Sequence, residues 1–210
     1  MRNIKKKVLF GITSLTLGGA ERVLVDISNK LCEKYDITIF SIYDNGELKK
    51  ELNHNVRFKS LYNCRYDELT RAQKMWNPIK ILLFSKYIYR KKIKQNYDVE
   101  IAFLEGPITR LFSNKNENTR KIVWIHNDIK RVFGNGFKAR LKSRIDKKIY
   151  TKYDDIIFVS NDNMEKFQEV YNDINPEKMR VIYNYINSDL VIEKSNMKST
   201  ELLKYTEKKF

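Results

Sequence analysis

Gly18 and Gly19 are the first residues of the chain that could act on a ligand. They separate an apolar segment, Val8 to Ile12, from a segment in which apolar residues recur at helical spacing. Glycine lets a ligand approach the backbone closely, and the first turn of a helix offers unpaired N–H groups to an anion. The pattern therefore indicates a phosphate-binding turn, and a plain strand-to-helix turn is the alternative that two glycines alone leave open.

His126 is the candidate for a group that acts on the reacting part of a ligand. It follows the apolar run V-W-I and precedes Asn127 and Asp128. An imidazole in this place can donate a hydrogen bond to a ligand hydroxyl or stabilise a developing charge. A histidine that only caps the following loop is the alternative. The expected position of His126 beside the glycine turn favours a functional role.

Seven short apolar segments are predicted to be β-strands, because they are rich in β-branched and aromatic residues. They span residues 8–12, 36–42, 56–61, 98–104, 121–125, 155–159 and 179–183. Helices are predicted where apolar residues recur three or four positions apart, at residues 20–31, 78–95, 137–149 and 164–171. Pro78 stands near the start of the second helix, as helix starts prefer. Strands that alternate with helices imply an α/β fold with a parallel sheet covered on both faces.

The carboxyl ends of parallel strands lie along one edge of the sheet, where ligands bind in folds of this class. The residues that follow the predicted strands are small, polar or titratable: Gly18, Gly19, Glu105, Gly106, His126, Asn127, Asp128, Ser160, Asn161 and Asn184. Ser160 is expected to cap the next helix, which is a structural role, and Asn184 could be structural or ligand-binding. The sequence therefore predicts the binding site at this edge.

The composition excludes several classes of protein. With 42% hydrophobic residues the chain is too apolar to be disordered, and two cysteines cannot form a disulfide scaffold. The two histidines and two cysteines lack zinc-binding spacing, so no metal is expected. The fingerprint G-x-G-x-x-G and the phosphate loop ending in Gly-Lys-Ser/Thr are absent, which counts against a dehydrogenase and a P-loop NTPase. No apolar run has the length of a transmembrane helix.

The first residues also look like a secretory signal peptide, since Arg2 and Lys5 to Lys7 precede an apolar stretch that ends before Ala20. Hydroxyl residues, among them Thr13 and Thr16, dilute that stretch. The following residues fit a helix packed on a strand, which cleavage near Ala20 would separate. The favoured interpretation is therefore a mature strand, turn and helix.

The net charge of +15 comes from 41 Lys and Arg against 26 Asp and Glu. Two predicted helices carry much of it, through Lys86, Arg90, Lys91, Lys94, Lys138, Arg140, Lys142 and Arg144. On the first of these helices Ile81, Phe84 and Ile88 project to another side, so the basic residues form a separate face. Such a face could bind an anionic membrane surface, and a solvated helix face is the alternative. Nucleic-acid binding is not expected, because no recognised motif is present and the basic residues are widely spread.

Four segments of the chain form a pattern when they are taken together. The most specific is K-V-L-F-G-I-T-S-L-T-L-G-G-A-E-R-V-L at Lys7 to Leu24, in which a strand precedes G-G-x-E-R. The others are W-I-H-N-D at Trp124 to Asp128, I-I-F-V-S-N at Ile156 to Asn161 and E-K-M-R-V-I-Y-N-Y-I-N at Glu177 to Asn187. In order and spacing they resemble the N-terminal domain of family-four (group 1) GT-B glycosyltransferases, over nearly the whole chain.

The resemblance implies a single Rossmann-like α/β domain with a parallel sheet of about seven strands, the N-terminal half of a GT-B fold. Such enzymes transfer a sugar from a nucleotide-sugar donor with retention of configuration, usually without a metal or other cofactor. By this resemblance the amides around Gly18 and Gly19 face the donor diphosphate, Glu21 belongs to the same substrate-binding motif, and His126 contacts the transferred sugar as an orienting group. The further candidates for substrate binding are Asn127, Asp128, Ser160 and Asn184.

The resemblance also implies how the chain is divided. It places the domain at residues 1–188 and a polar linker or tail at 189–210, leading towards a C-terminal domain that carries most donor contacts. Tyr185 and Asn187 depart from the family's junction motif, which usually has Gly and Asp at these positions. Because the donor contacts of that second domain are missing, we expect little or no transferase activity from this chain alone.

The expected function is therefore a part of sugar transfer to a cell-surface glycan or a lipid-linked acceptor. The expected location is the cytoplasm, with peripheral attachment to the inner face of the cell membrane. Two alternatives stay open. One is a non-catalytic domain, derived from such an enzyme, that binds a membrane or a partner chain. The other is a nucleotide-binding oxidoreductase.

Overall fold

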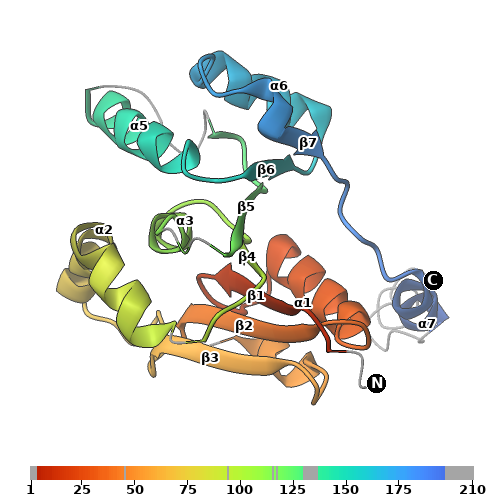
Figure 1. Cartoon of the computed structure of the whole chain (residues 1–210). Coiled ribbons are helices and arrows are strands. Elements are labelled where there is room, and N and C mark those ends of the chain that lie inside the picture. The colour runs from red at the N-terminus through yellow and green to blue at the C-terminus, as the bar shows by residue number, and fades with distance from the viewer. Residues whose placement is uncertain are drawn as a thin grey trace, which may run out of the picture.

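The computed structural model of the chain describes residues 4–44, 46–93, 95–114, 116, 118–129 and 137–196. Within these ranges seven strands form one parallel sheet in the order β3-β2-β1-β4-β5-β6-β7 (Figure 1). The strands are β1 (Lys7–Ile12), β2 (Asp36–Tyr43), β3 (Arg57–Tyr62), β4 (Val99–Ala102), β5 (Arg120–Ile125), β6 (Asp155–Phe158) and β7 (Met179–Val181). The predicted α/β fold with a parallel sheet is confirmed.

β1 lies between β2 and β4, and the direction in which the chain builds the sheet reverses there. From β1 the chain moves outward through β2 to β3, then crosses to β4 and moves outward the other way to β7. In open parallel sheets, ligands bind outside the carboxyl ends of the strands at such a reversal. The turns after β1, β4 and β5 are therefore the part of the edge where a site is expected.

Helices cover both faces of the sheet (Figure 1). α1 (Gly19–Leu31) and the 3-10 helix η1 (Glu47–Glu51) contribute to one core, and α2 (Arg71–Lys92), α3 (Pro107–Phe112), α5 (Phe137–Tyr150) and α6 (Asn161–Val170) contribute to the other. Neighbouring strand residues alternate between the two cores: Leu9 belongs to the core under α2 and α3, and Phe10 to the core under α1. Burial on both faces explains why the strands read as continuous apolar runs.

α3 lies directly against β1, and this contact explains the glycine at position 11. A Cβ at Gly11 would lie 2.5 Å from Phe112 Cζ and 2.7 Å from Ile108 Cγ1, closer than carbon atoms can pack. α3 begins after Gly106, whose φ is +100°, and Pro107 occupies its first turn. The sequence predicted no helix here, because six residues are too few to show a helical period.

α2 begins earlier than predicted, at Arg71 instead of Pro78. Thr70 and Gln73 form a capping box: Gln73 N–H donates to Thr70 Oγ1 at 3.2 Å, and Thr70 N–H donates to Gln73 Oε1 at 2.9 Å. This pairing satisfies the first N–H groups of the helix, so the helix does not need the proline to start. Pro78 lies inside the helix.

The outer face of α2 also differs from the prediction. Ile81 is buried and Ile88 is half-buried, whereas Phe84 is 57% exposed. Phe84 has non-helical backbone angles, φ −111° and ψ 19°, so the helix is kinked at this residue. The sequence spacing grouped Phe84 with Ile81 and Ile88 on one side of the helix, and the structure leaves Phe84 exposed at the kink.

The predicted basic residues are only partly described. Lys86, Arg90 and Lys91 on α2 and Arg144 on α5 are exposed. Lys94 and the side chains of Lys138, Arg140 and Lys142 lie outside the described residues.

The chain after β7 returns to the other side of the sheet. It runs from Ile182 past Asn187 to α7 (Ser188–Asn196), which lies near α1 (Figure 1). The first part of the segment predicted as a polar linker or tail is therefore helical, and residues 197–210 lie outside the described ranges. None of the helices so described has the length and apolar content that crossing a membrane requires.

Candidate functional site

The turn after β1 places Gly18 and Gly19 at the start of α1. Gly18 is the N-cap with an extended backbone, and Arg22 N–H donates the first helical bond to its carbonyl at 3.0 Å. Gly18 provides no side-chain cap. A Cβ at Gly19 would meet no atom within 4 Å, so the space in front of this residue is open. This turn can therefore present N–H groups to an anion.

Glu21 lies over the same turn. Its Oε2 would be 2.2 Å from a Cβ at Gly18, so its carboxylate packs directly against this glycine. The helix dipole favours a negative charge in the first turn of α1. A phosphate that binds at the turn has to displace this carboxylate or bind beside it.

A loop after β2 supports the turn from the side. Gly46 has a φ of +130°, and a Cβ there would lie 1.9 Å from the carbonyl carbon of Leu15. Leu48 N–H donates to the Leu15 carbonyl at 3.1 Å. Glycine alone permits both this φ and this close approach of two backbones. Gly46 is thus a structural requirement of the edge, although no motif in the sequence marks it.

Glu105 joins the turns after β4 and β5. Its Oε1 accepts hydrogen bonds from the backbone N–H of His126 at 2.6 Å and of Asn127 at 2.8 Å. Its Oε2 accepts from Asn127 Nδ2 at 2.8 Å. The sequence placed Glu105 at this edge without giving it a role. The available signal was a carboxylate after one strand and unpaired backbone N–H groups after the neighbouring strand.

His126 is packed among aromatic rings on the α1 side of the sheet. Its ring centroid lies 4.5 Å from that of Phe103 and 6.0 Å from that of Trp124. Its Nε2 is buried and has no hydrogen-bond partner in the described part of the chain, and the same holds for Trp124 Nε1. Burial lowers the pKa of His126 to about 4, so the ring is neutral at pH 7. An unpaired buried nitrogen costs about 1–3 kcal/mol, so its presence here needs an explanation.

Asp128 connects the turn after β5 to α6. Lys166 Nζ lies 3.1 Å from Asp128 Oδ2 and 2.8 Å from Asp162 Oδ2. Hydrogen bonds to the two carboxylates raise the pKa of Lys166. Asp128 therefore takes part in an ion-pair cluster whose lysine no sequence motif indicates.

Ser160 caps α6, as expected, by accepting a hydrogen bond from Asn163 N–H at 3.2 Å. Asn184 is exposed in the segment between β7 and α7. Further along this segment, Tyr185 and Asn187 help to line a pocket of 290 Å³ against Arg22 of α1. The segment after β7 therefore reaches α1, which the sequence did not predict.

The site residues are spread along the edge. Glu105, His126 and Asn127 are in direct contact. The glycine turn follows β1, two strands from β5, a separation of roughly 10 Å at the usual strand spacing. Ser160 follows the strand on the other side of β5. Across the described ranges, no three or more His, Cys, Asp or Glu side chains come together in a way that could hold a metal ion.

Comparisons with known proteins identify the family of the chain and agree with its fold. Residues 17–190 match Glycosyltransferase Family 4. The GalNAc-alpha-(1->4)-GalNAc-alpha-(1->3)-diNAcBac-PP-undecaprenol alpha-1,4-N-acetyl-D-galactosaminyltransferase of Campylobacter jejuni is 33% identical over 100 residues, which are 47% of this chain and 26% of that enzyme.

Solved structures of Anabaena Alr3699/HepE share the fold. The complex with UDP and glucose has a TM-score of 0.60 at 15% identity, over 88% of this chain and 46% of HepE. The complex with UDP-glucose has a TM-score of 0.57 at 15% identity, over 91% of this chain and 49% of HepE. The chain thus spans about half the length of HepE, and its 100 matched residues span about a quarter of the Campylobacter enzyme. Since the family match extends from the glycine turn to α7, the chain belongs to glycosyltransferase family 4.

Proposed function

We propose that the chain is the N-terminal domain of a retaining glycosyltransferase that transfers a sugar from a nucleotide-sugar to a cell-surface glycan or lipid-linked acceptor. The observation that carries the proposal is the edge at the strand reversal. There, in a family-four chain, an open glycine turn lies two strands from a fixed loop with an unpaired histidine nitrogen. The turn suits a phosphate, and the histidine suits a hydroxyl-bearing ligand.

The donor diphosphate binds in front of Gly19, where no atom obstructs the backbone. The carboxylate of Glu21 then moves away from the turn, because it would repel the phosphates at this distance. The solved complexes of the structural neighbour HepE contain UDP and UDP-glucose, which supports a nucleotide-sugar as the ligand class.

His126 orients the transferred sugar as a neutral imidazole. Its buried Nε2 has no partner in the described part of the chain, so a sugar hydroxyl that reaches the ring can pair with this nitrogen. Glu105 fixes the backbone of His126 and Asn127 from the neighbouring strand, so the ring and the Asn127 amide keep their positions when a ligand arrives. Such prepositioned polar groups stabilise charge that develops during the transfer.

The domain works at the inner face of the membrane. The name of the Campylobacter relative describes a glycan carried by undecaprenol through a diphosphate. In this chain α2 exposes an apolar stripe, formed by Met75, Trp76, Ile79, Leu83, Phe84 and Tyr87. Exposed Lys86, Arg90 and Lys91 lie beside it. Large apolar residues next to Lys and Arg are typical of helices that lie on anionic membranes.

Ligand-observed saturation-transfer NMR on the purified chain tests the donor class. We expect UDP and UDP-glucose to receive saturation and NADH to receive none. In His126→Ala, the glucose protons should lose saturation while the uridine protons keep it. His54→Ala, a change at an exposed histidine, is the matched control and should bind as the wild type does. Binding of NADH alone would contradict the proposal and favour an oxidoreductase, and unchanged saturation of the glucose protons in His126→Ala would contradict the role given to this ring.

The non-catalytic alternative rests on the same α2 stripe and needs a different measurement. We expect the chain to float with vesicles that contain anionic lipid, and to transfer little or no sugar by itself. Flotation without any binding of UDP or UDP-glucose would favour a membrane-binding domain without a part in catalysis. Rapid sugar transfer by this chain alone would refute the need for donor contacts from a second domain.

A further inference from the structure

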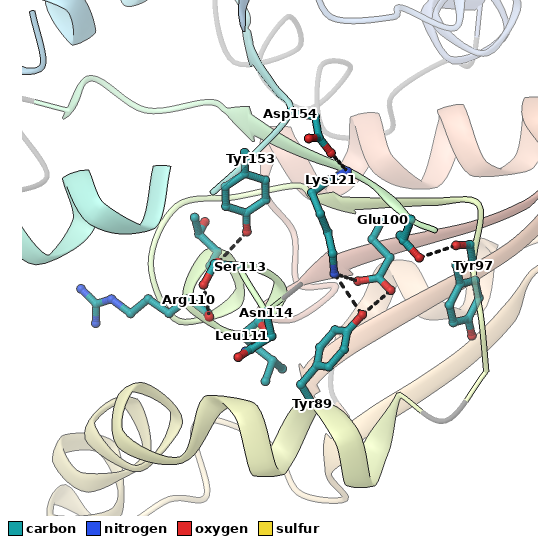
Figure 2. A network of polar contacts seen from close by, with 12 residues as sticks. Tyr89, Tyr97, Glu100, Arg110, Leu111, Ser113, Asn114, Lys121, Tyr153 and Asp154 are labelled. Carbon is teal, nitrogen blue, oxygen red and sulfur yellow. Dashed lines mark hydrogen bonds and ion pairs between the residues drawn. The ribbon is translucent and has the colours of Figure 1, made fainter. Parts of the chain in front are cut away.

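A pocket of 420 Å³ lies between α2 and the C-terminal end of α3. Its lining residues come from three separate segments: Lys86, Tyr89, Arg90, Ser113, Asn114 and Lys152. Figure 2 shows Tyr89 rising from α2 beside the end of α3, where Ser113 and Asn114 lie. α3 starts at the carboxyl edge and is six residues long, so the pocket lies about 9 Å along the helix axis from that edge. It is therefore separate from the site around His126.

The charge of this pocket is positive. Lys86, Arg90 and Lys152 contribute three cations, and none of them takes part in the ion pairs found between the described residues. The acids on the surrounding elements are already engaged. Glu100 pairs with Lys121 at 2.6 Å, and Asp146 pairs with Arg110 at 2.9 Å. The three cations are therefore available to an anion from outside.

The end of α3 does not repel such an anion as an open helix C-terminus would. The carbonyl oxygen of Arg110 accepts from Ser113 Oγ at 2.9 Å, and that of Leu111 accepts from Asn114 Nδ2 at 2.7 Å. The carbonyl oxygen of Thr109 accepts from Tyr153 OH at 2.5 Å (Figure 2). These bonds satisfy three of the last four carbonyl groups of the helix and weaken its negative end.

A buried network fixes the wall that α2 contributes. Tyr89 OH donates to Glu100 Oε1 at 2.6 Å, and Lys121 Nζ donates to Tyr89 OH at 3.0 Å (Figure 2). Tyr89 is thereby tied to β4 and β5. Lys86 and Arg90 lie three positions before and one position after Tyr89 on the same helix, so their backbone positions are set by the sheet.

An apolar shelf continues from this pocket along α2. A second hollow, of 390 Å³, is lined by Leu83, Phe84, Lys86, Tyr87 and Arg90, and shares Lys86 and Arg90 with the first. Leu83 is 69% exposed, Phe84 57% and Tyr87 63%. A small inorganic anion needs only the cations. A ligand that joins an anion to hydrocarbon uses both the cations and the shelf.

We propose that this pocket binds the phosphate group of a membrane lipid, with the lipid chain lying over Leu83, Phe84 and Tyr87. The three cations favour a phosphate group. The exposed apolar residues beside them favour a phosphate that carries a lipid chain over free phosphate. The inference rests on the proposed membrane-facing function and makes it more specific, because a discrete pocket replaces a diffuse basic face. The bound lipid fixes how the domain is rotated on the membrane, with α2 against the bilayer.

The test compares the full chain with paired variants that lose the same charge. Titration calorimetry with short-chain dihexanoyl phosphatidic acid, below its micelle concentration, and with inorganic phosphate gives the affinities. In the pocket variant Arg90→Gln with Lys152→Gln, two charge-assisted bonds are lost, so we expect the dissociation constant for the lipid to rise about tenfold or more. In the control Lys34→Gln with Lys50→Gln, at exposed residues of the turn after α1 and of η1, we expect a change below about twofold.

A shelf variant separates the two sources of phosphate. Leu83→Ser is expected to weaken the lipid about threefold to fivefold and to leave inorganic phosphate unchanged, because only the lipid loses apolar contact. Ile4→Ser, at another exposed apolar residue, is the control and should change neither. If inorganic phosphate binds as tightly as the lipid and Leu83→Ser has no effect, a free-phosphate site replaces the lipid site.

Vesicle flotation distinguishes a failure of this inference from a failure of the proposed function. The pocket is supported if the wild-type chain and the control variants float with anionic vesicles and the pocket variants do not. Wild-type chain that floats while pocket and control variants are released equally overturns the pocket and leaves the membrane-facing function intact. Wild-type chain that does not float at all overturns the membrane-facing function, and the pocket proposal with it.

Discussion

The carboxyl edge of the sheet and the layer between α2 and the sheet differ in whether their buried polar groups have hydrogen-bond partners. At the edge, His126 Nε2 and Trp124 Nε1 are buried and unpaired within the described part of the chain. Under α2, Lys121, Glu100 and Tyr89 satisfy one another at 2.6–3.0 Å. Lys121 is 3% exposed and Glu100 is fully buried.

This difference distinguishes polar groups that hold the fold from polar groups that could bind a ligand. A saturated network fixes one arrangement of the chain and gains nothing from a ligand. An unpaired buried group lowers the stability of the free protein. A ligand that forms a hydrogen bond with such a group can restore part of that stability. The layer under α2 therefore fixes the scaffold and one wall of the basic pocket, whereas the edge keeps buried polar groups without partners in the described part of the chain.

The largest expected effect comes from breaking the saturated network. Lys121→Met leaves the Glu100 carboxylate buried without its cation, so we expect the free energy of unfolding to fall by about 3–5 kcal/mol. Urea denaturation followed by circular dichroism measures it, and Lys34→Met is the exposed control. Adding Glu100→Met to Lys121→Met should restore most of the loss, because no buried charge remains. A loss below about 1 kcal/mol in the single variant would show that the pair is not structural.

The next effect is a pH dependence at the edge. The pKa of His126 is about 4 in the folded chain and ordinarily 6.5, so the unfolded chain binds the proton more tightly. As the pH falls from about 6.5 towards 4, the native state should lose up to about 3 kcal/mol, and above 6.5 this contribution is complete and constant. Urea unfolding at several pH values gives the slope. His126→Asn should flatten it and His54→Asn should not; equal slopes in both variants would contradict the buried neutral imidazole.

The smallest effect tests the hydrogen bonds that hold the edge. Glu105→Ala leaves the N–H groups of His126 and Asn127 without their acceptor, and we expect a loss of about 1–3 kcal/mol. The matched control is Glu33→Ala, at an exposed residue, with a change within about 0.5 kcal/mol. Amide NMR spectra should show the His126 and Asn127 signals moving in the first variant alone. Unmoved signals would mean that the carboxylate does not position this loop.

The parts of the fold that depend on local pattern were predicted well. Continuous apolar runs gave the strands, and the parallel sheet then placed Gly18 and His126 at one edge. Features that depend on contacts between distant segments were not predicted. Glu105 finds its partners 21 and 22 positions away, and Gly46 is explained only by the backbone at Leu15. Phe84 is exposed at a kink that helical spacing does not encode.

The most direct test of the central claim is to map where UDP-glucose binds, with amide NMR on the isotope-labelled chain. We expect saturable shifts at Gly18, Gly19, His126 and Asn127, and none at the saturated network around Glu100 and Lys121. Shifts at the network with an unchanged edge would contradict the account, because the ligand would then bind where every buried polar group already has its partner.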